Sequence, residues 1–222
     1  MPFTTARRPD RLTVVLILLT GVTGVVEAVS YLGLDRLFTA VMTGNILFVG
    51  FGLVDDAIPI AGSAVALVAF SVGALASHRV NGALARRHPD RWLTYAVCGE
   101  GVLIMVAALI ALGLPSNATQ HTPHRYAVIV VLALAMGSRN TTVLLVAARD
   151  LPTTVVTRAL AGLFMLPSPA TAGRRFATVA AMFAGALIGA LLLAVHPAAA
   201  LAVASAVEIL AGALCPRTEP QG

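Results

Sequence analysis

Eight apolar segments occupy most of this chain, and they constrain its fold more than any other feature of the sequence. Average soluble domains carry about 25% charged residues, whereas this chain of 222 residues carries 11% and is 58% hydrophobic. We therefore expect an all-α polytopic membrane protein. The apolar segments are 12–34, 38–54, 57–77, 92–114, 126–148, 151–166, 174–195 and 197–214.

Two of these segments are too short to cross a bilayer as ordinary helices. A perpendicular crossing takes about 20 residues, whereas segments 38–54 and 151–166 contain 17 and 16. The first includes Thr43, Gly44 and Asn45 within "FTAVMTGNILFVG". These residue types favour a turn or a broken helix, because glycine tolerates unusual backbone angles and the polar side chains satisfy freed backbone groups. Length alone leaves open whether the two segments span or re-enter.

The arginines indicate which loops face the cytoplasm. All 15 basic residues are Arg, and the net charge is +5. Arginine concentrates in cytoplasmic loops, yet eight ordinary spans after a cytoplasmic N-terminus would put the loop 78–91 outside. If 38–54 and 151–166 re-enter, that loop lies inside. Ten of the 15 arginines are then cytoplasmic: Arg7, Arg8, Arg11, Arg79, Arg86, Arg87, Arg91, Arg174, Arg175 and Arg217. We therefore expect six transmembrane helices plus two short re-entrant or broken segments, with both termini in the cytoplasm.

A weak internal repeat divides the chain into two halves. Gly24 begins "GVVEA" and Thr43 follows in "MTGN", whereas Gly137 begins "GSRNT" and Thr157 follows in "VVTRA". The offsets are 113 and 114 residues. Three spans in each half would make the repeats inverted, and inverted repeats with short interrupted segments are typical of transporters. The predicted halves, which together form one membrane domain, are residues 1–114 and 115–222.

Glu27 and Arg139 are ionisable residues within the apolar segments, and they occupy nearly equivalent places in the two halves. Inserting such a group into a bilayer costs about 2.5–3.5 kcal/mol, so it is usually paired or functional. We expect the two side chains to face each other near mid-bilayer, with Asn45 and Asn140 as neutral partners. Two interpretations stay open: a fixed ion pair that stabilises the fold, or part of a site for a solute or proton.

Three further charges lie in or beside the apolar segments, namely Glu100, Arg158 and Glu208. The two carboxylates belong to the last helix of each half. They could couple proton movement, or they could hydrogen-bond to a neighbouring helix or to Arg158. We group all three as coupling or structural charges.

These groups predict a transporter or channel for a small polar or ionic solute, with a central site between the repeats. The alternative is a non-transport membrane scaffold or partner subunit whose intramembrane ion pairs are structural. We expect no enzyme activity, metal, cofactor or nucleic-acid partner, because no corresponding motif is present; the bilayer is the expected partner, and homo-oligomers stay open. The predicted solute-binding residues are Glu27, Thr43, Gly44, Asn45, Arg139, Asn140 and Thr157.

The stretch "GVVEAVSYLGLDRLFTAVMTGNILFVGFGL" resembles the signature of the YoaK-like family of bacterial membrane proteins, a domain of unknown function. The resemblance covers essentially the whole chain and implies a multi-pass protein of the bacterial inner membrane, without a defined activity. Glu27 stands where the family usually has Asp. Arg139 replaces the usual Gln, and Arg158 replaces a second Gly after Thr157, so the solute is expected to differ between members.

Overall fold

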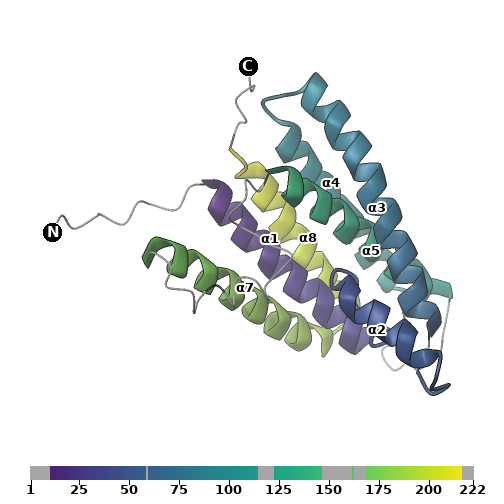
Figure 1. The fold of residues 1–222 in the computed structure, drawn as a ribbon. Coiled ribbons are helices and arrows are strands. Elements are labelled where there is room, and N and C mark those ends of the chain that lie inside the picture. The colour runs from purple at the N-terminus through teal and green to yellow at the C-terminus, as the bar shows by residue number, and fades with distance from the viewer. Residues whose placement is uncertain (1–10, 59, 115–122, 147–161, 163–168, 217–222) are drawn as a thin grey trace.

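The computed structural model describes residues 11–58, 60–114, 123–146, 162 and 169–216. Within these residues the chain forms seven α-helices and no strand (Figure 1), which confirms the all-α expectation. The helices are α1 (Arg11–Ala28, continued by a π-helical turn Val29–Gly33), α2 (Met42–Gly52), α3 (Ile60–Arg87), α4 (Trp92–Ala111), α5 (Pro123–Val146), α7 (Pro169–Leu193) and α8 (Pro197–Ala213).

Five helical stretches are long and apolar enough to cross a membrane. They are Arg11–Gly33, Ile60–Arg87, Trp92–Ala111, Pro123–Val146 and Thr171–Leu193. Two other apolar helices are shorter, namely α2 and α8. With a rise of 1.5 Å per residue, the 11 residues of α2 reach only about 16 Å, which is half of a hydrocarbon core about 30 Å thick. Each described helix lies within or close to one of the expected apolar segments.

The helices pack mainly in three pairs, α1 with α7, α3 with α5, and α4 with α8. In the first pair Gly21 lies against Ala181 and Gly33 against Leu193, so both helices run in the same direction. The pair α3 and α5 is also parallel, because Gly73 lies against Leu134 while Asn81 bonds to Thr142 further along both helices. The pair α4 and α8 is antiparallel, with Cys98 against Gly212 and Gly101 against Glu208.

Two glycines allow the parallel pairs to approach closely. A Cβ atom on Gly24 would lie 2.7 Å from the backbone nitrogen of Ala186 on α7. A Cβ atom on Gly137 would lie 2.9 Å from the backbone nitrogen of Ala74 on α3. Real Cβ contacts do not occur at such distances, so the absence of a side chain at both positions sets the spacing of the helices.

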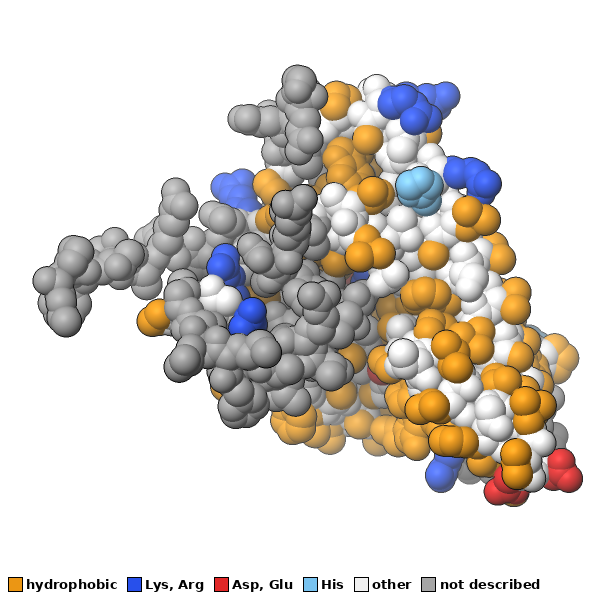
Figure 2. All heavy atoms as spheres, viewed as in Figure 1, with side chains coloured by type: hydrophobic (Ala, Val, Ile, Leu, Met, Phe, Trp, Pro, Cys, Tyr) orange, Lys and Arg blue, Asp and Glu red, His pale blue; other side chains and the backbone are white. Residues whose placement is uncertain are grey.

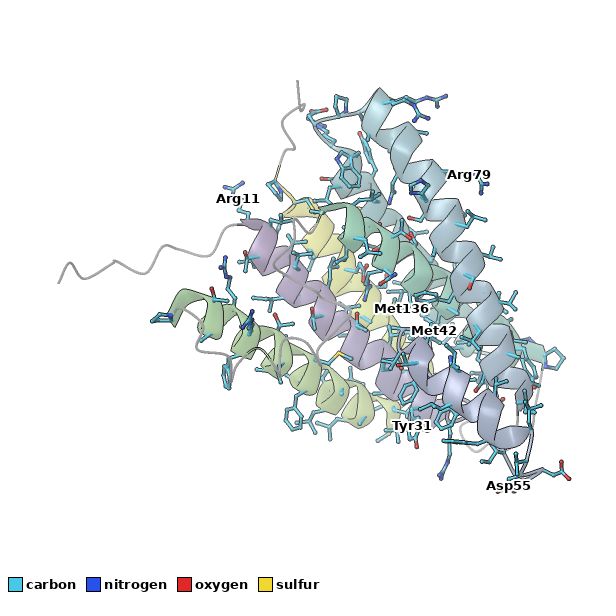
Figure 3. All side chains as sticks on the ribbon, viewed as in Figure 1. Arg11, Tyr31, Met42, Asp55, Arg79 and Met136 are labelled. Carbon is cyan, nitrogen blue, oxygen red and sulfur yellow. The ribbon has the colours of Figure 1, made fainter. Side chains whose placement is uncertain are left out.

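After α1 the chain turns back along the helix it has just left. The backbone N–H groups of Thr39 and Ala40 donate to the Glu27 carboxylate, and the hydroxyl of Thr39 lies 2.9 Å from that of Ser30. Residues 39 and 40 therefore lie level with the last turns of α1. Helix α2 then leads away to Asp55, near the end of the bundle from which α3 starts (Figures 1 and 3).

Helix α3 is longer than the apolar segment that predicts it. The prediction of a loop at 78–91 is wrong in its first part, because helix α3 continues to Arg87. Alanine, leucine and arginine are good helix formers, and Arg86 and Arg87 in the last turn interact favourably with the helix dipole. The change from apolar to polar residues therefore marks where α3 leaves the apolar layer, whereas the helix itself ends just before Pro89.

The interior and the surface are both largely apolar. One buried cluster combines residues of α1, α3, α4, α5 and α8, so residues from both sequence halves form one core. Large apolar side chains are also exposed, among them Phe183 at 70% and Leu191 at 65% on α7. Figure 2 shows apolar side chains over the middle of one face and acidic residues at its lower end, with basic side chains at the upper end, on the left flank and beside the acidic residues. This is the surface of a protein that is surrounded by lipid.

Candidate functional site

Arg139 is the centre of a charge cluster inside the helix bundle. It lies on α5 three residues after Met136, which is at mid-height in the bundle (Figure 3). The guanidinium group donates to the α1 carbonyl oxygen of Leu19 over 3.2 Å and to the Thr23 hydroxyl over 2.8 Å. Its Nη2 atom forms an ion pair with Glu208 Oε2 on α8, and its Nε atom lies 3.8 Å from Glu100 Oε2 on α4. One side chain thus connects four helices.

Glu100 is held by hydroxyl groups as well as by the arginine. Its Oε1 atom accepts hydrogen bonds from Thr142 over 2.6 Å and from Ser138 over 3.3 Å, both on α5. The amide of Asn81 on α3 donates in turn to the Thr142 hydroxyl over 3.0 Å, and it also donates to Ser77 over the same distance. The polar network therefore extends from α8 through α5 and α4 to α3.

The cluster is sealed from the outside and its formal charges are unequal. Arg139, Glu100 and Glu208 are exposed by 3%, 1% and 0%. Burial of charges in a medium of low polarity is costly unless each is paired. One guanidinium here faces two carboxyl groups, so the cluster carries one excess negative charge if both are ionised. Two of the carboxyl oxygens, Glu100 Oε2 and Glu208 Oε1, have no hydrogen-bond donor.

The predicted pairing of Glu27 with Arg139 is wrong. Arg139 contacts α1 at Leu19 and Thr23, and Glu27 lies one helical turn beyond Thr23. The Oε1 atom of Glu27 instead accepts the backbone N–H groups of Thr39 and Ala40. The carboxylate therefore satisfies backbone donors where the chain leaves regular helix, a need that is acute in a membrane because no water is available there.

This arrangement predicts different effects for two replacements of Glu27. Glu27→Gln keeps the Oε1 acceptor, and we expect it to change the free energy of unfolding by less than about 1 kcal/mol. Glu27→Leu leaves two buried N–H groups without an acceptor and should cost at least about 2 kcal/mol. Unfolding in mixed micelles titrated with sodium dodecyl sulfate, followed by circular dichroism, measures both. Equal losses for the two variants would contradict a role as a hydrogen-bond acceptor.

Asn45 fixes the same break in the chain from the other side. Its side chain is fully buried; Oδ1 accepts from the Phe38 N–H over 2.9 Å, and Nδ2 donates to the Phe38 carbonyl over 2.6 Å. The ring of Phe38 stacks between Tyr31 and Phe48. A Cβ atom on Gly44 would lie 2.6 Å from that ring. Gly44 and Asn45 thus stabilise the turn that precedes α2, whereas Thr43, another predicted site residue, is exposed.

We expect Asn45→Ala to lower the free energy of unfolding by about 1–3 kcal/mol, because it leaves the N–H and C=O groups of Phe38 unpaired. Thr43 is exposed on the same helix, so Thr43→Ala is the matched control and should be close to neutral. The same micelle titration compares the two variants. A loss at Thr43 that equals the loss at Asn45 would contradict this account.

The structure brings only some of the predicted site residues together. Arg139, Glu100 and Glu208 form one cluster, whereas Glu27 and Asn45 stabilise the chain break. Asn140 is half-buried beside Arg139 on α5. Thr157 and Arg158 lie outside the described residues. Glu100 bonds to Ser138 and Thr142 on α5, and Glu208 pairs with Arg139 on the same helix.

Sequence reasoning missed the uncharged members of the cluster. They are Thr23, Ser77, Asn81, Ser138 and Thr142. A signal for part of this set was present, because residues 138, 139 and 142 lie on one side of a helix when they are spaced by three and four. Small polar residues are common in membrane helices, so the spacing alone does not separate these from packing residues.

A bundle of long apolar helices with lipid-compatible surfaces and a buried charge cluster defines a multi-pass helical membrane protein. Residues 15–214 match the model of the family described as "Protein of unknown function (DUF1275)", and the chain belongs to this family. The YoaK-like resemblance of the sequence is consistent with that membership. No curated protein and no solved structure matches the chain.

Proposed function

We propose that this protein moves a small polar or ionic solute across the bacterial inner membrane through a central site at Arg139, Glu100 and Glu208. The observation that carries the proposal is the complete burial of three ionisable side chains, with unequal charges, in the middle of an apolar bundle. Ionisable residues inside membrane proteins mark solute and proton pathways, because they are otherwise selected against. A lock that only stabilises the fold would need one carboxylate for one guanidinium.

Matched helix contacts support an inverted repeat. Gly24 on α1 lies against residues 182 and 186 of α7, and Gly137 on α5 lies against residues 70 and 74 of α3. Gly137 follows Gly24 by 113 residues, and residues 182 and 186 follow residues 70 and 74 by 112. Each contact therefore has a counterpart in the other half. Exchanging α1 with α5, α3 with α7, and α4 with α8 reproduces the main helix pairs. Glu100 and Glu208 occupy the exchanged helices α4 and α8, close to the axis that relates the halves.

The topology that we propose has six spans and a re-entrant segment at 38–54; the second short segment, 151–166, lies outside the described residues except for residue 162. The 17 residues of α8 supply the sixth span with a length of about 25 Å. Both termini then lie in the cytoplasm, on the same side as the arginines at the end of α3. This proposal is supported by the short α2 and by the return of the chain along α1.

Accessibility of the cluster to the two sides of the membrane tests the function without knowledge of the solute. Ser205 is fully buried on α8, one turn before Glu208, and Ser205→Cys is introduced after Cys98 and Cys215 are replaced by Ala. Right-side-out and inside-out vesicles are then treated with an impermeant maleimide. A transporter alternates between open states, so we expect the new cysteine to react from both sides. Ala66→Cys, equally buried on α3, is the matched control and should stay unreactive.

The alternative is a membrane scaffold or partner subunit. It is supported by the direct ion pair between Arg139 and Glu208 and by the many hydrogen bonds that hold the cluster in one arrangement. A scaffold has no need to open, so a cysteine at position 205 that reacts from neither side would favour this alternative and contradict transport.

A further inference from the structure

Two carboxyl oxygens in the charge cluster lack any donor, and they belong to neighbouring side chains. Glu100 Oε2 and Glu208 Oε1 are both buried without a hydrogen-bond partner, as is the Arg139 Nε atom 3.8 Å from Glu100 Oε2. Both carboxyl groups lie beside the Arg139 guanidinium, and Gly101, the residue after Glu100, lies against the Glu208 side chain. The other oxygens are satisfied: Glu100 Oε1 by hydroxyl groups and Glu208 Oε2 by Arg139. Two buried acceptors beside one guanidinium are thus left without a hydrogen bond, and one added hydrogen atom would supply the missing donor.

The charges lead to the same requirement. Among the described residues, Arg139 is the arginine of the cluster; it is paired directly with Glu208, whereas its Nε atom is 3.8 Å from Glu100. A second carboxylate at this depth would remain without an equal counter-charge, which is costly in a medium of low polarity. One proton neutralises the excess charge and provides the missing donor.

We propose that Glu100 and Glu208 form a binding site for one exchangeable proton, and that this proton is the coupling ion of the transport function proposed above, on which the coupling role rests. In the loaded state Glu100 Oε2 carries the proton and donates it to Glu208 Oε1, while Glu208 Oε2 stays paired with Arg139. The net charge of the cluster is then zero. Release of the proton to water leaves both groups as carboxylates and the cluster with one negative charge.

Glu100 is the carrier of the proton because Arg139 pairs directly with Glu208, whereas the groups that donate hydrogen bonds to Glu100 are the neutral hydroxyls of Thr142 and Ser138. The groups around the two carboxyl groups come from α1, α3, α4 and α5 and from the segment after α8. Arg139 on α5 is the nearest cation, and its guanidinium also donates to the Thr23 hydroxyl on α1. Asn81 on α3 donates to the Thr142 hydroxyl, which in turn bonds to Glu100. Within the part of the chain that the structure describes, the thiols of Cys98 on α4 and of Cys215 after α8 are the other titratable neighbours.

Infrared spectroscopy of the full-length chain in lipid nanodiscs tests the site independently of transport. A protonated carboxyl group gives a C=O stretching band that a carboxylate lacks. We expect such a band near neutral pH and its loss in Glu100→Gln. We also expect its loss in Glu208→Gln, because Glu100 then becomes the single anionic partner of Arg139. Glu27→Gln changes a buried glutamate outside the cluster and should keep the band.

Each outcome of these spectra decides the proposal. A band that is lost in both cluster variants and kept in Glu27→Gln supports one shared proton. A spectrum in which both cluster variants match the wild type overturns it, and so does a band that survives in Glu208→Gln. If Glu100→Gln fails to fold, the Glu208→Gln spectrum still decides. A shared proton combined with an inert cysteine at position 205 would retain the proton site and reject transport, so the two failures are distinguishable.

Discussion

Replacing Arg139 with glutamine is expected to destabilise the protein by about 3–5 kcal/mol, the usual cost of removing one partner from a buried ion pair. The variant leaves Glu208 without its direct cation and Glu100 without its nearest positive charge. It also removes donors from the Leu19 carbonyl and the Thr23 hydroxyl on α1. Unfolding in mixed micelles, followed by circular dichroism, measures the loss.

A second replacement separates the charge from the shape of the side chain. Arg139→Gln combined with Glu208→Gln removes one charge of each sign, so we expect the double variant to recover at least half of the loss. Arg91→Gln removes an arginine whose side chain is more than half exposed and should be neutral within about 0.5 kcal/mol. A single Arg139→Gln variant as stable as Arg91→Gln would refute the importance of the cluster for the fold.

The second large effect is expected at the two glycines that bring the parallel helices together. Gly137→Ala introduces a Cβ atom that meets the backbone of α3 at Phe70 and Ala74. Backbone atoms cannot move aside as a flexible side chain can, so we expect a loss of about 3 kcal/mol, at the upper end for overpacking. Gly24→Ala should cause a similar loss, because it meets the backbone of α7 in the corresponding way.

Gly99→Ala is the matched control for both variants. Gly99 lies within α4, and a Cβ atom there would meet nothing within 4 Å. Alanine is the better helix former by about 1 kcal/mol, so this control should be neutral or slightly stabilising in the same micelle titration. If all three alanine variants behave alike, close helix approach at residues 24 and 137 is not what stabilises the bundle.

The helices could be predicted well because each arises from a continuous apolar run. The run 174–195 predicts most of α7, and the run 197–214 predicts α8 within one residue at its end. The end of α3 was missed, since hydropathy reports the environment of a residue and not its backbone conformation. Helix α2 is shorter than its apolar run because the backbone N–H groups of Phe38, Thr39 and Ala40 bond to the side chains of Asn45 and Glu27 instead of continuing a helix.

The membership of the site was predictable to a lesser extent. Burial of Glu100, Arg139 and Glu208 follows from their apolar surroundings in the sequence. The choice of partner does not, because a shift of one helical turn, about 5.4 Å, decides whether Arg139 meets Thr23 or Glu27 on α1. The position of a residue in the repeat predicts which helix it contacts, but not which turn of that helix. The partner therefore depends on the packing of α5 against α1, α4 and α8.

The chain is synthesised from its N-terminus, so Arg139 is made before its partner Glu208. These residues are 69 positions apart. The close contact of Gly24 on α1 likewise forms only after α7 has been synthesised. During synthesis Arg139 enters the membrane well before its main counter-charge exists. Until α8 is made, a charged residue at this depth costs about 2.5–3.5 kcal/mol, and the ion pair with Glu208 offsets part of this cost only when the last helix is in place.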